Sequence, residues 1–435
     1  MPVVLRVMAD RTSGALLGRG VPAACVILLA AGTLAAPPGA AVTSKRSVAA
    51  SGFQPQSVSF VGQSIWSVGT VACPGHVRCP ELWESGDSGK RWARLALPPA
   101  LSSLVDRARP GTFAYDSAPP VLNVRFANAR DGWLFGNIPL PARVQGVVST
   151  TWAPALWATH DGGSAWRAVA FKGLDRSYPY GAVLDLGAAG GTAYLVVAGR
   201  GFHAQVESSP VTGGLWHTDP APPLPLPAGG GETSGDFVFV GGQGWLVEGN
   251  GRGVTGSARL ESSGKWATWR APCRDVGDGY PALAASSATN LVAMCTIGGF
   301  VASRSPADPP GSVPGLSTWL YGSDNGGESF RPVAGLAKRG RPVFNFDVLA
   351  SPSPGVVLTS RDGRLVPSSD GGRHWEVVYR RGPSYVHFSG SRDGIGLFGT
   401  GYMGTMALTH DGGMHWQPVP LPAVRLARPP SPATA

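Results

Sequence analysis

A recurring eight-residue frame constrains the fold of this chain more than any other feature of its sequence. Four copies read Ser/Thr-x-Asp-x-Gly-x-x-Trp, and they begin at Ser85, Thr159, Ser368 and Thr409. A fifth copy, which begins at Ser323, has Asn and Phe at the Asp and Trp positions. Two more are degenerate: the copy at Ser209 has lost the Asp, and the copy that ends at Trp266 is shorter. Seven copies of one motif indicate a repeat architecture, in which each repeat is one supersecondary unit.

The frame has a local physical logic. The Asp carboxylate can accept hydrogen bonds from backbone amides of its own tight turn. The Gly two residues later allows a positive φ, and the aromatic residue begins a strand and packs against a neighbouring repeat. We therefore assign a structural role, rather than a catalytic or calcium-binding one, to the best-matching pairs: Asp87 and Trp92, Asp161 and Trp166, Asn325 and Phe330, Asp370 and Trp375, and Asp411 and Trp416.

Two short alternating strands precede each copy of the frame. Val124–Phe126 followed by Gly132–Gly136 is one example, and Phe237–Phe239 followed by Gly244–Val247 is another. Together with the two strands around the frame, each repeat supplies four strands, which is one blade of a propeller. The 62 Gly and 40 Pro suit many short strands joined by turns. The sequence predicts an all-β, seven-bladed β-propeller of four-stranded antiparallel blades over residues 57–423.

The frame resembles the Asp-box, or bacterial neuraminidase repeat, of sialidases, sortilin-type receptors and propeller glycosidases. Its pairing with an upstream Gly-Trp strand, as in Gly132-Trp133 and Gly244-Trp245, is most similar to the photosystem II stability/assembly factor family. That resemblance implies a binding, scaffold or assembly role without known chemistry and without a cofactor. It covers about residues 57–421, but its motifs specify blade structure rather than a binding site.

The alternative function is that of a glycoside hydrolase, sialidase-like or otherwise glycan-cleaving. Sialidases carry an Arg-Ile-Pro triplet near the first blade, which the chain after residue 41 lacks; the nearest string, Asn137-Ile-Pro139, has no Arg. A hydrolase also needs two carboxyl groups, or a Tyr nucleophile and its acid, on either side of the bond. No spacing in the sequence selects such a pair. We therefore name no catalytic residue, and we expect a protein that is not an enzyme.

The N-terminus is predicted to direct export. Three Arg precede an apolar run from Val21 to Ala36, which ends in small residues up to Ala41. This run is shorter than the roughly 20 residues that span a bilayer. We predict a signal peptide over 1–41, with an uncleaved anchor as the alternative, a linker over 42–56 and a disordered tail over 424–435. The mature protein is then secreted or associated with the cell envelope, without a transmembrane span.

The net charge limits the classes of partner that the protein can bind, and the cysteines indicate the compartment in which it is found. The formal net charge of +9 is mildly basic, and no Lys/Arg run resembles a nucleic-acid arm. We expect a monomer that binds a protein or an anionic glycan or envelope polymer, not nucleic acid. An exported chain can oxidise its cysteines, so we predict the disulfides Cys73–Cys79 and Cys273–Cys295. A metal site at Cys73, His76 and Cys79 is the alternative, but no fourth ligand lies nearby in the sequence.

Strand direction predicts where a partner binds. Because direction alternates within a blade, the Asp-box hairpins and the short first turns share one face, and the long insertions share the other. Function concentrates in loops held by a rigid scaffold. The candidate binding residues are basic and aromatic residues of those insertions: Arg107, Arg109, Tyr115, Arg143, Arg176, Tyr178, Lys338, Arg339 and Arg341. The alternative is that they are solvated loop charges.

Overall fold

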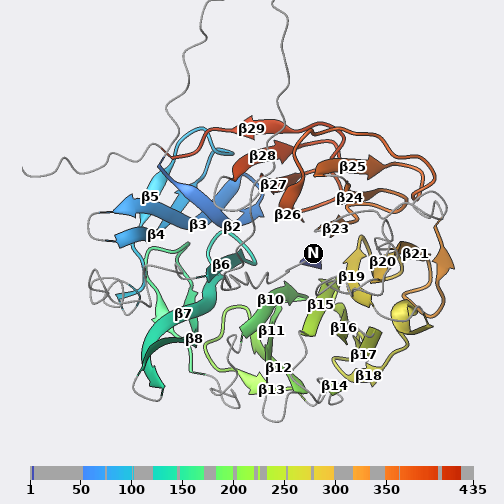
Figure 1. The fold of residues 1–435 in the computed structure, drawn as a ribbon, viewed down its shortest axis with the longest axis horizontal. Coiled ribbons are helices and arrows are strands. Elements are labelled where there is room, and N and C mark those ends of the chain that lie inside the picture. The colour runs from blue at the N-terminus through green and yellow to red at the C-terminus, as the bar shows by residue number, and fades with distance from the viewer. Residues whose placement is uncertain are drawn as a thin grey trace, which may run out of the picture. The chain divides into compact units, whose positions relative to one another are not determined.

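The protein is a seven-bladed β-propeller of antiparallel sheets, as the repeats predict (Figure 1). The computed structural model describes residues 2–3, 52–73, 76–99, 101, 121–144, 147–170, 183–198, 203–219, 224–225, 233–250, 253–275, 279–297, 317–333, 348–361, 363–399 and 404–422. No helix among these residues is long and apolar enough to cross a membrane. Apart from the two-residue strand β1 (Pro2–Val3), the predicted signal peptide lies outside the described residues, as does the predicted tail.

Each blade is formed by consecutive strands, numbered from the centre of the ring outwards. Blades one to three contain β2 (Gln54–Val61), β3 (Ser64–Cys73), β4 (His76–Ser85) and β5 (Ala93–Leu95); β6 (Val121–Phe126), β7 (Gly132–Val144), β8 (Val147–Thr159) and β9 (Arg167–Ala168); and β10 (Val183–Ala189), β11 (Thr192–Ala198), β12 (His203–Pro210) and β13 (His217–Thr218). Blades four and five contain β15 (Thr233–Val240), β16 (Gln243–Asn250), β17 (Gly253–Leu260) and β18 (Trp266–Thr268); and β19 (Gly279–Ala285), β20 (Leu291–Ile297), β21 (Ser317–Ser323) and β22 (Arg331–Pro332). Blades six and seven contain β23 (Leu349–Ala350), β24 (Val357–Arg361) and β25 (Arg364–Ser368); and β26 (Pro383–Phe388), β27 (Gly394–Phe398), β28 (Thr405–Thr409) and β29 (Gln417–Val419).

Three blades depart from the simple pattern. Strand β1 pairs with the inner edge of β15 in blade four, and β14 (Leu224–Pro225) pairs with β12 in blade three. In blade six the outer strand is reduced to a single bridge between Leu365 and Tyr379. Pro367 in β25 gives a physical reason, because a proline has no N–H to donate to a fourth strand.

The ring closes without exchange of a strand between its two ends. Among the described residues, blade one is formed by β2 to β5 and blade seven by β26 to β29. Strand β2 begins at Gln54, ahead of the expected start at Ser57, and the preceding Phe53 is buried beside Trp83. The two end blades meet through packed side chains, and Trp92 of blade one donates from Nε1 to the Pro420 carbonyl beyond β29 at 2.8 Å.

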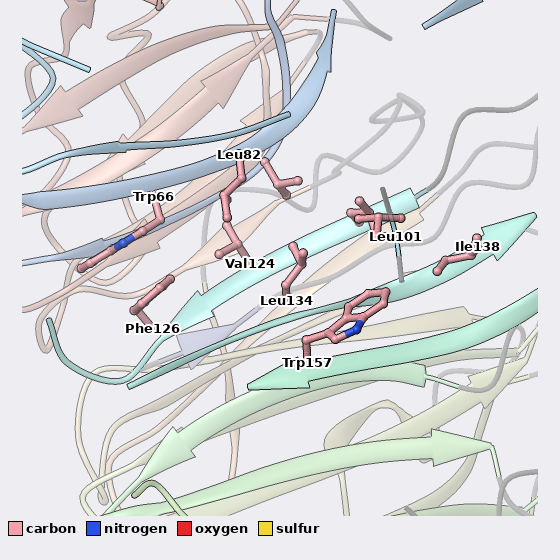
Figure 2. Packing of buried hydrophobic residues seen from close by; sticks show 10 residues of the cluster. Trp66, Leu82, Leu101, Val124, Phe126, Leu134, Ile138 and Trp157 are labelled. Atoms are coloured by element: carbon pink, nitrogen blue, oxygen red, sulfur yellow. The ribbon is translucent and has the colours of Figure 1, made fainter. Parts of the chain in front are cut away.

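Seven apolar clusters hold the ring together, one at each junction between neighbouring blades. Figure 2 shows the cluster between blades one and two, where the rings of Trp66 and Phe126 stack with centroids 3.8 Å apart. Each cluster also contains the aromatic residue of one repeat frame, which packs against the preceding blade. These residues are Trp92, Trp166, Trp216, Trp266, Phe330, Trp375 and Trp416.

The five Asp-box turns share one hydrogen-bond pattern. In blade seven, Thr409 Oγ1 donates to Asp411 Oδ1 at 2.9 Å and accepts from the Gly413 amide at 2.9 Å, while Oδ1 also accepts from the His415 amide at 2.9 Å. The hydroxyl at the first position is therefore as much a part of the turn as the carboxylate. In blade five Asn325 replaces the Asp, and its Oδ1 accepts the same two hydrogen bonds.

Each box is also tied to the first turn of its own blade. The Gly162 amide donates to the Arg130 carbonyl at 2.9 Å, and equivalent bonds join Gly326 to Thr289 and Gly412 to Arg392. The boxes and the first turns therefore lie on the same face of the ring, as strand direction predicts. The second turns, between the second and third strands of each blade, lie at the opposite ends of the strands.

The fifth residue of each of these five boxes is a glycine that the preceding blade contacts. Gly372 has φ +91°, and a Cβ atom built on it would overlap Val333, which follows the outer strand of blade five. Its neighbour Gly371 has φ +73° and open space where a Cβ would lie. At the ring closure, a Cβ on Gly89 would likewise overlap Val419 of blade seven. These glycines are required by the junctions between blades as well as by their own turns.

We expect Asp161→Ala or Asp411→Ala to lower the free energy of unfolding by about 1–3 kcal/mol, because each change leaves turn donors without an acceptor. Ligand binding should be retained. Asp161→Asn and Asp411→Asn are the matched controls and should cost much less, since Asn325 makes the same bonds in blade five. Urea unfolding of the four variants measures the difference. Loss of binding by Asp411→Ala with unchanged stability would contradict a structural role.

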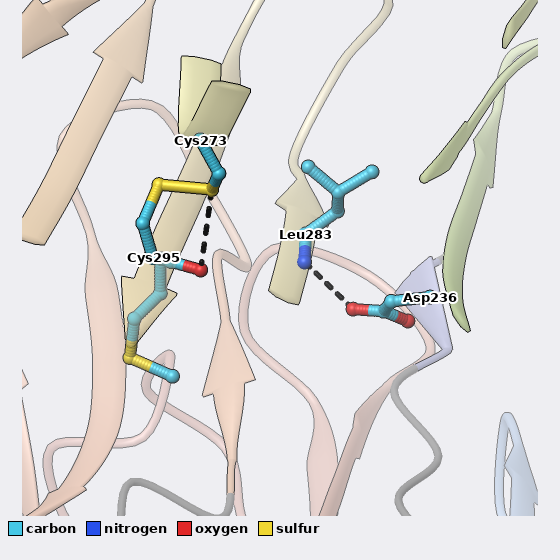
Figure 3. Close-up of a disulfide and its surroundings, with 5 residues drawn as sticks. Asp236, Cys273, Leu283 and Cys295 are labelled. Atoms are coloured by element: carbon cyan, nitrogen blue, oxygen red, sulfur yellow. Dashed lines mark hydrogen bonds between the residues drawn. A yellow bond between two sulfur atoms is a disulfide. The ribbon is translucent and has the colours of Figure 1, made fainter. Parts of the chain in front are cut away.

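A disulfide joins Cys273 and Cys295 at an S–S distance of 2.07 Å (Figure 3). Cys273 lies in the 3₁₀ helix η1 (Pro272–Asp275), which follows blade four, and Cys295 lies in β20 of blade five. The bond therefore joins the connection between blades four and five to the second strand of blade five. The Cys79 sulfur is also in a disulfide, whereas the side chain of Cys73, its predicted partner, lies outside the described residues.

Candidate functional site

The predicted binding residues fall almost entirely outside the described part of the chain. Arg143 is the exception: its backbone lies near the end of β7, although its side chain is not described. The remaining eight residues lie in undescribed segments: Arg107, Arg109, Tyr115, Arg176, Tyr178, Lys338, Arg339 and Arg341. Their grouping on one face remains a prediction from strand direction.

The segment expected as a loop around Arg143 is an extended β-hairpin. Strands β7 and β8 are 13 residues each, compared with 7 in β20 and 5 in β27. They pair without interruption from Gly132–Thr159 to Val144–Val147. The inner strand β6 accompanies β7 only as far as Asn137. The remaining residues therefore extend roughly 20 Å beyond the paired part of the blade, at about 3.3 Å per residue.

A second polar feature lies at the centre of the ring, where the first strands of the blades meet (Figure 1). Ser57, Asp185, Asp236 and Tyr385 occupy the same register position in four blades, opposite Val68, Val196, Val247 and Leu397 respectively. Arg125 and His387 lie two residues closer to the first turn than that position in their own blades. All six side chains are buried. We call Ser57, Arg125, Asp185, Tyr385 and His387 the axial cluster.

Arg125 connects the members of this cluster. Its Nη1 donates to Ser57 Oγ at 3.1 Å and to the Val124 carbonyl at 2.8 Å. Its Nη2 lies 3.8 Å from Asp185 Oδ1, which is too long for a hydrogen bond. Its Cζ lies 5.0 Å from the ring centroid of Tyr385, a cation–π distance. One guanidinium thus makes contact with blades one, three and seven.

Burial shifts the titration of the groups around Arg125. Burial raises the pKa of Asp185 to about 6, although the charge of Arg125 opposes this shift. Burial also raises the pKa of Tyr385 to about 12. It lowers the pKa of His387 to about 3, and the positive charges of Arg125 and of the amino terminus act in the same direction. At neutral pH the side chains of Tyr385 and His387 are therefore uncharged.

Asp236 has a structural role beside the cluster. Its Oδ2 accepts a hydrogen bond of 2.6 Å from the Leu283 amide on the inner edge of blade five (Figure 3). Ser59 caps the Phe126 amide of blade two in the same way, at 2.8 Å. Burial raises the pKa of Asp236 well above its ordinary value, and the nearby charge of Asp185 adds to this shift. A polar side chain of one blade thus accepts a hydrogen bond from a backbone amide on the inner strand of the next blade.

Glu248 is a buried carboxyl group of a different kind. It lies in β16 of blade four, and neither of its oxygens has a hydrogen-bond partner. Burial raises the pKa of Glu248 to about 8. The side chain is therefore largely protonated at neutral pH. The absence of a partner makes this residue a source of pH-dependent stability.

The carboxylates of the Asp boxes are occupied within their own turns. Hydrogen bonds from the side chain and amide of Arg91 lower the pKa of Asp87 to about 2. Histidines pair with carboxylates on the same face: His374 Nδ1 lies 2.5 Å from Asp370, and His415 Nδ1 lies 2.6 Å from Asp411. Among the described residues, no three His, Cys, Asp or Glu side chains are grouped to hold a metal ion.

The axial cluster was not among the sequence-predicted site residues. Arg125 and Asp185 lie inside segments that the repeats correctly mark as strands. The signal in the sequence was a charged residue between apolar neighbours in an inner strand, as in Val124-Arg125-Phe126. Such a residue is buried with its strand, and a buried charge requires a partner or a ligand.

The order and pairing of the strands define a seven-bladed β-propeller. No family model matches the chain, and no curated protein matches it. Among solved structures, YCF48 from Cyanidioschyzon merolae is 16% identical with a TM-score of 0.47, covering 83% of this chain and 96% of that one. A polysaccharide lyase, PL25 ulvan lyase bound to a glucuronic acid–rhamnose sulfate unit, is 11% identical with a TM-score of 0.48, over 83% and 94%. The β-propeller domain of the trilobed protease from Pyrococcus furiosus, which has an open velcro topology, is 10% identical with a TM-score of 0.46, over 85% and 95%.

Proposed function

We propose that this protein is an exported propeller that binds a protein or an anionic glycan or envelope polymer, and that it serves as a scaffold or assembly factor rather than as an enzyme. The partner binds to the face opposite the Asp boxes. The β7–β8 hairpin carries this proposal, because it extends that face well beyond the blade and has Arg143 next to its tip.

The different construction of the two faces supports this assignment. On the Asp-box face, hydrogen bonds join each described box to the first turn of its blade, so that face is formed by short, fixed turns. The opposite face has the long β7–β8 hairpin and, in blade five, the connection between β20 and β21, which runs from residue 298 to residue 316. Binding residues are commonly carried by the long segments at one end of a rigid scaffold.

The disulfides support export. Cys273–Cys295 joins the connection after blade four to blade five, and Cys79 is also oxidised. Structural disulfides persist in secreted and envelope proteins and are rare in reducing compartments. Their presence agrees with the apolar run after the N-terminal arginines, which is typical of a signal peptide.

A shortened hairpin tests the binding face. Ile138 and Ala153 are paired in the sheet, so residues 139–152 can be replaced by Asn-Gly, a two-residue hairpin turn. We expect the variant to keep its melting temperature within a few degrees, because the removed residues lie beyond the pairing with β6. It should lose most of its capture of envelope proteins or teichoic acid in a pull-down.

The triple reversal Lys338→Glu, Arg339→Glu and Arg341→Glu tests the charge of the same face and should weaken capture in a salt-sensitive manner. The matched control is Arg373→Glu, an exposed reversal within the Asp box of blade six, and it should leave capture unchanged. Capture that survives both the shortening and the triple reversal, but is lost with Arg373→Glu, would place the binding face on the Asp-box side.

A further inference from the structure

The axial cluster contains buried polar atoms without hydrogen-bond partners. Arg125 Nε and Nη2 have no hydrogen-bond partner, and neither do Tyr385 Oη and His387 Nδ1. The three residues are 5%, 7% and 4% exposed. Buried polar atoms in native proteins are nearly always paired with protein, water or a ligand. Four unpaired atoms on neighbouring side chains therefore indicate a missing binding partner in the centre of the ring.

The geometry of Arg125 indicates the shape of that partner. Its Nη1 is engaged by Ser57 and Val124, which fixes the orientation of the guanidinium plane. The unpaired atoms, Nε and Nη2, form one edge of that plane. Their two N–H bonds are parallel, and a carboxylate accepts such a pair in the bidentate arrangement preferred by arginine. The Asp185 carboxylate does not fill this position, since its Oδ1 is 3.8 Å from Nη2.

The surroundings favour an anionic group. The Tyr385 hydroxyl can donate a further hydrogen bond, and its ring already lies against the Arg125 guanidinium. Nearby, Ser57 and Asp236 accept hydrogen bonds from Arg125 and Leu283, and Asp185 Oδ1 accepts one from the Leu186 amide. Most of the atoms left unpaired at the cluster are therefore donors. Strand β1 pairs with β15 beside these strands and contacts β10 and β26, so a two-residue segment lies next to the cluster in this structure.

We propose that the axial cluster is a binding site for a carboxylate group, held by the Nε–Nη2 edge of Arg125 and by the Tyr385 hydroxyl. This site is separate from the loop face and does not depend on the function proposed for that face. A small organic acid, or one carboxylate of a larger ligand, has the required chemistry. Ser57 fixes the guanidinium from blade one, and Asp185 lies beside it in blade three.

Calorimetric titration of the full chain with acetate, the probe for a carboxylate, tests this site. We expect saturable binding and a melting temperature that rises with acetate, as for any ligand of the folded state. Tyr385→Phe should weaken acetate binding about tenfold, the effect of one lost hydrogen bond. Arg125→Met should abolish it. Tyr379→Phe, the same substitution in blade six, is the matched control and should bind acetate as the unmodified protein does.

Tyr385→Phe also separates binding from folding. Because the Tyr385 hydroxyl has no partner in the unliganded protein, its removal should leave the melting temperature unchanged or higher. Sulfate and phosphate are the comparison probes, and they should bind more weakly than acetate. The proposal is overturned if acetate shows no saturable binding, if Tyr385→Phe binds acetate normally, or if sulfate or phosphate binds more tightly than acetate.

Discussion

Gly372→Ala should lower the free energy of unfolding by about 2–5 kcal/mol, whereas Gly371→Ala should lower it by only about 1–2 kcal/mol. Both glycines have positive φ, which costs an L-residue about 1–2 kcal/mol. Only at Gly372 would the added methyl group also overlap a neighbouring side chain, Val333, and such overpacking adds about 1–3 kcal/mol. Urea unfolding of the two single variants measures the difference.

A double variant identifies the contact responsible. Val333→Ala makes room at the junction between blades five and six, so it should recover part of the loss caused by Gly372→Ala. The two substitutions should therefore be coupled by about 1–3 kcal/mol in a double-mutant cycle. If the effects of the two substitutions on the free energy of unfolding were additive, Gly372 would be needed only for its backbone conformation. Equal losses of this free energy for Gly371→Ala and Gly372→Ala would lead to the same conclusion.

Glu248→Gln should stabilise the protein in alkaline solution. Burial raises the pKa of Glu248 from its ordinary value of 4.5 to about 8, so between these values the folded state binds more protons than the unfolded state. The free energy of unfolding therefore falls as the pH rises through this range and levels off above it. A glutamine does not titrate. At pH 9 the free energy of unfolding of the variant should exceed that of the unmodified protein by on the order of 4 kcal/mol, since a tenfold change in proton affinity corresponds to about 1.4 kcal/mol.

Urea unfolding at pH 5, 7 and 9 checks this expectation. The difference in free energy of unfolding between the variant and the unmodified protein should increase with pH. The control is Glu328→Gln, a substitution of an exposed carboxylate in blade five, and it should leave the pH dependence unchanged. Parallel stability curves for Glu248→Gln and the unmodified protein would show that this carboxyl group finds a partner in solution.

The sequence predicted the blades because the interactions that form them are local. The frame from Thr409 to Trp416 encodes its own turn, and the carboxylate, hydroxyl and glycine that close it lie within five residues. The alternating strands before each frame similarly define their own pairing. Seven such units in succession determine a ring of seven blades. In the described part of the chain, the outer strand that is reduced to a bridge is that of blade six, beside Pro367.

The contacts between blades were beyond prediction, because they depend on residues far apart in the chain. Trp66 Nε1 donates to the Gly162 carbonyl of the next blade at 2.9 Å, and Trp245 donates to Gly326 at 3.1 Å. Trp133 is the equivalent residue of blade two, but its Nε1 has no partner. The reason is the degenerate frame of blade three, where Val211 replaces the Asp and the turn closes differently, with Gly213 donating to Pro210.

The axial cluster depends on this long-range geometry as well. Neither Arg125 nor Tyr385 belongs to a motif, and 260 positions of chain separate them. Only closure of the ring brings the guanidinium to the tyrosine ring. The sequence could predict which face carries the long insertions, because that follows from strand direction alone. It could not predict how the insertions are arranged in space.

The closure of the ring also affects how such a chain can change in evolution. Among the described residues no strand is shared between blade one and blade seven, and apart from β1, which joins blade four, the strands of each blade come from one uninterrupted stretch of sequence. Duplication or deletion of such a stretch adds or removes a complete blade and leaves no sheet divided. The gene can also be circularly permuted at a connection between blades, with new ends in the segment between β9 and β10, and still encode seven whole sheets.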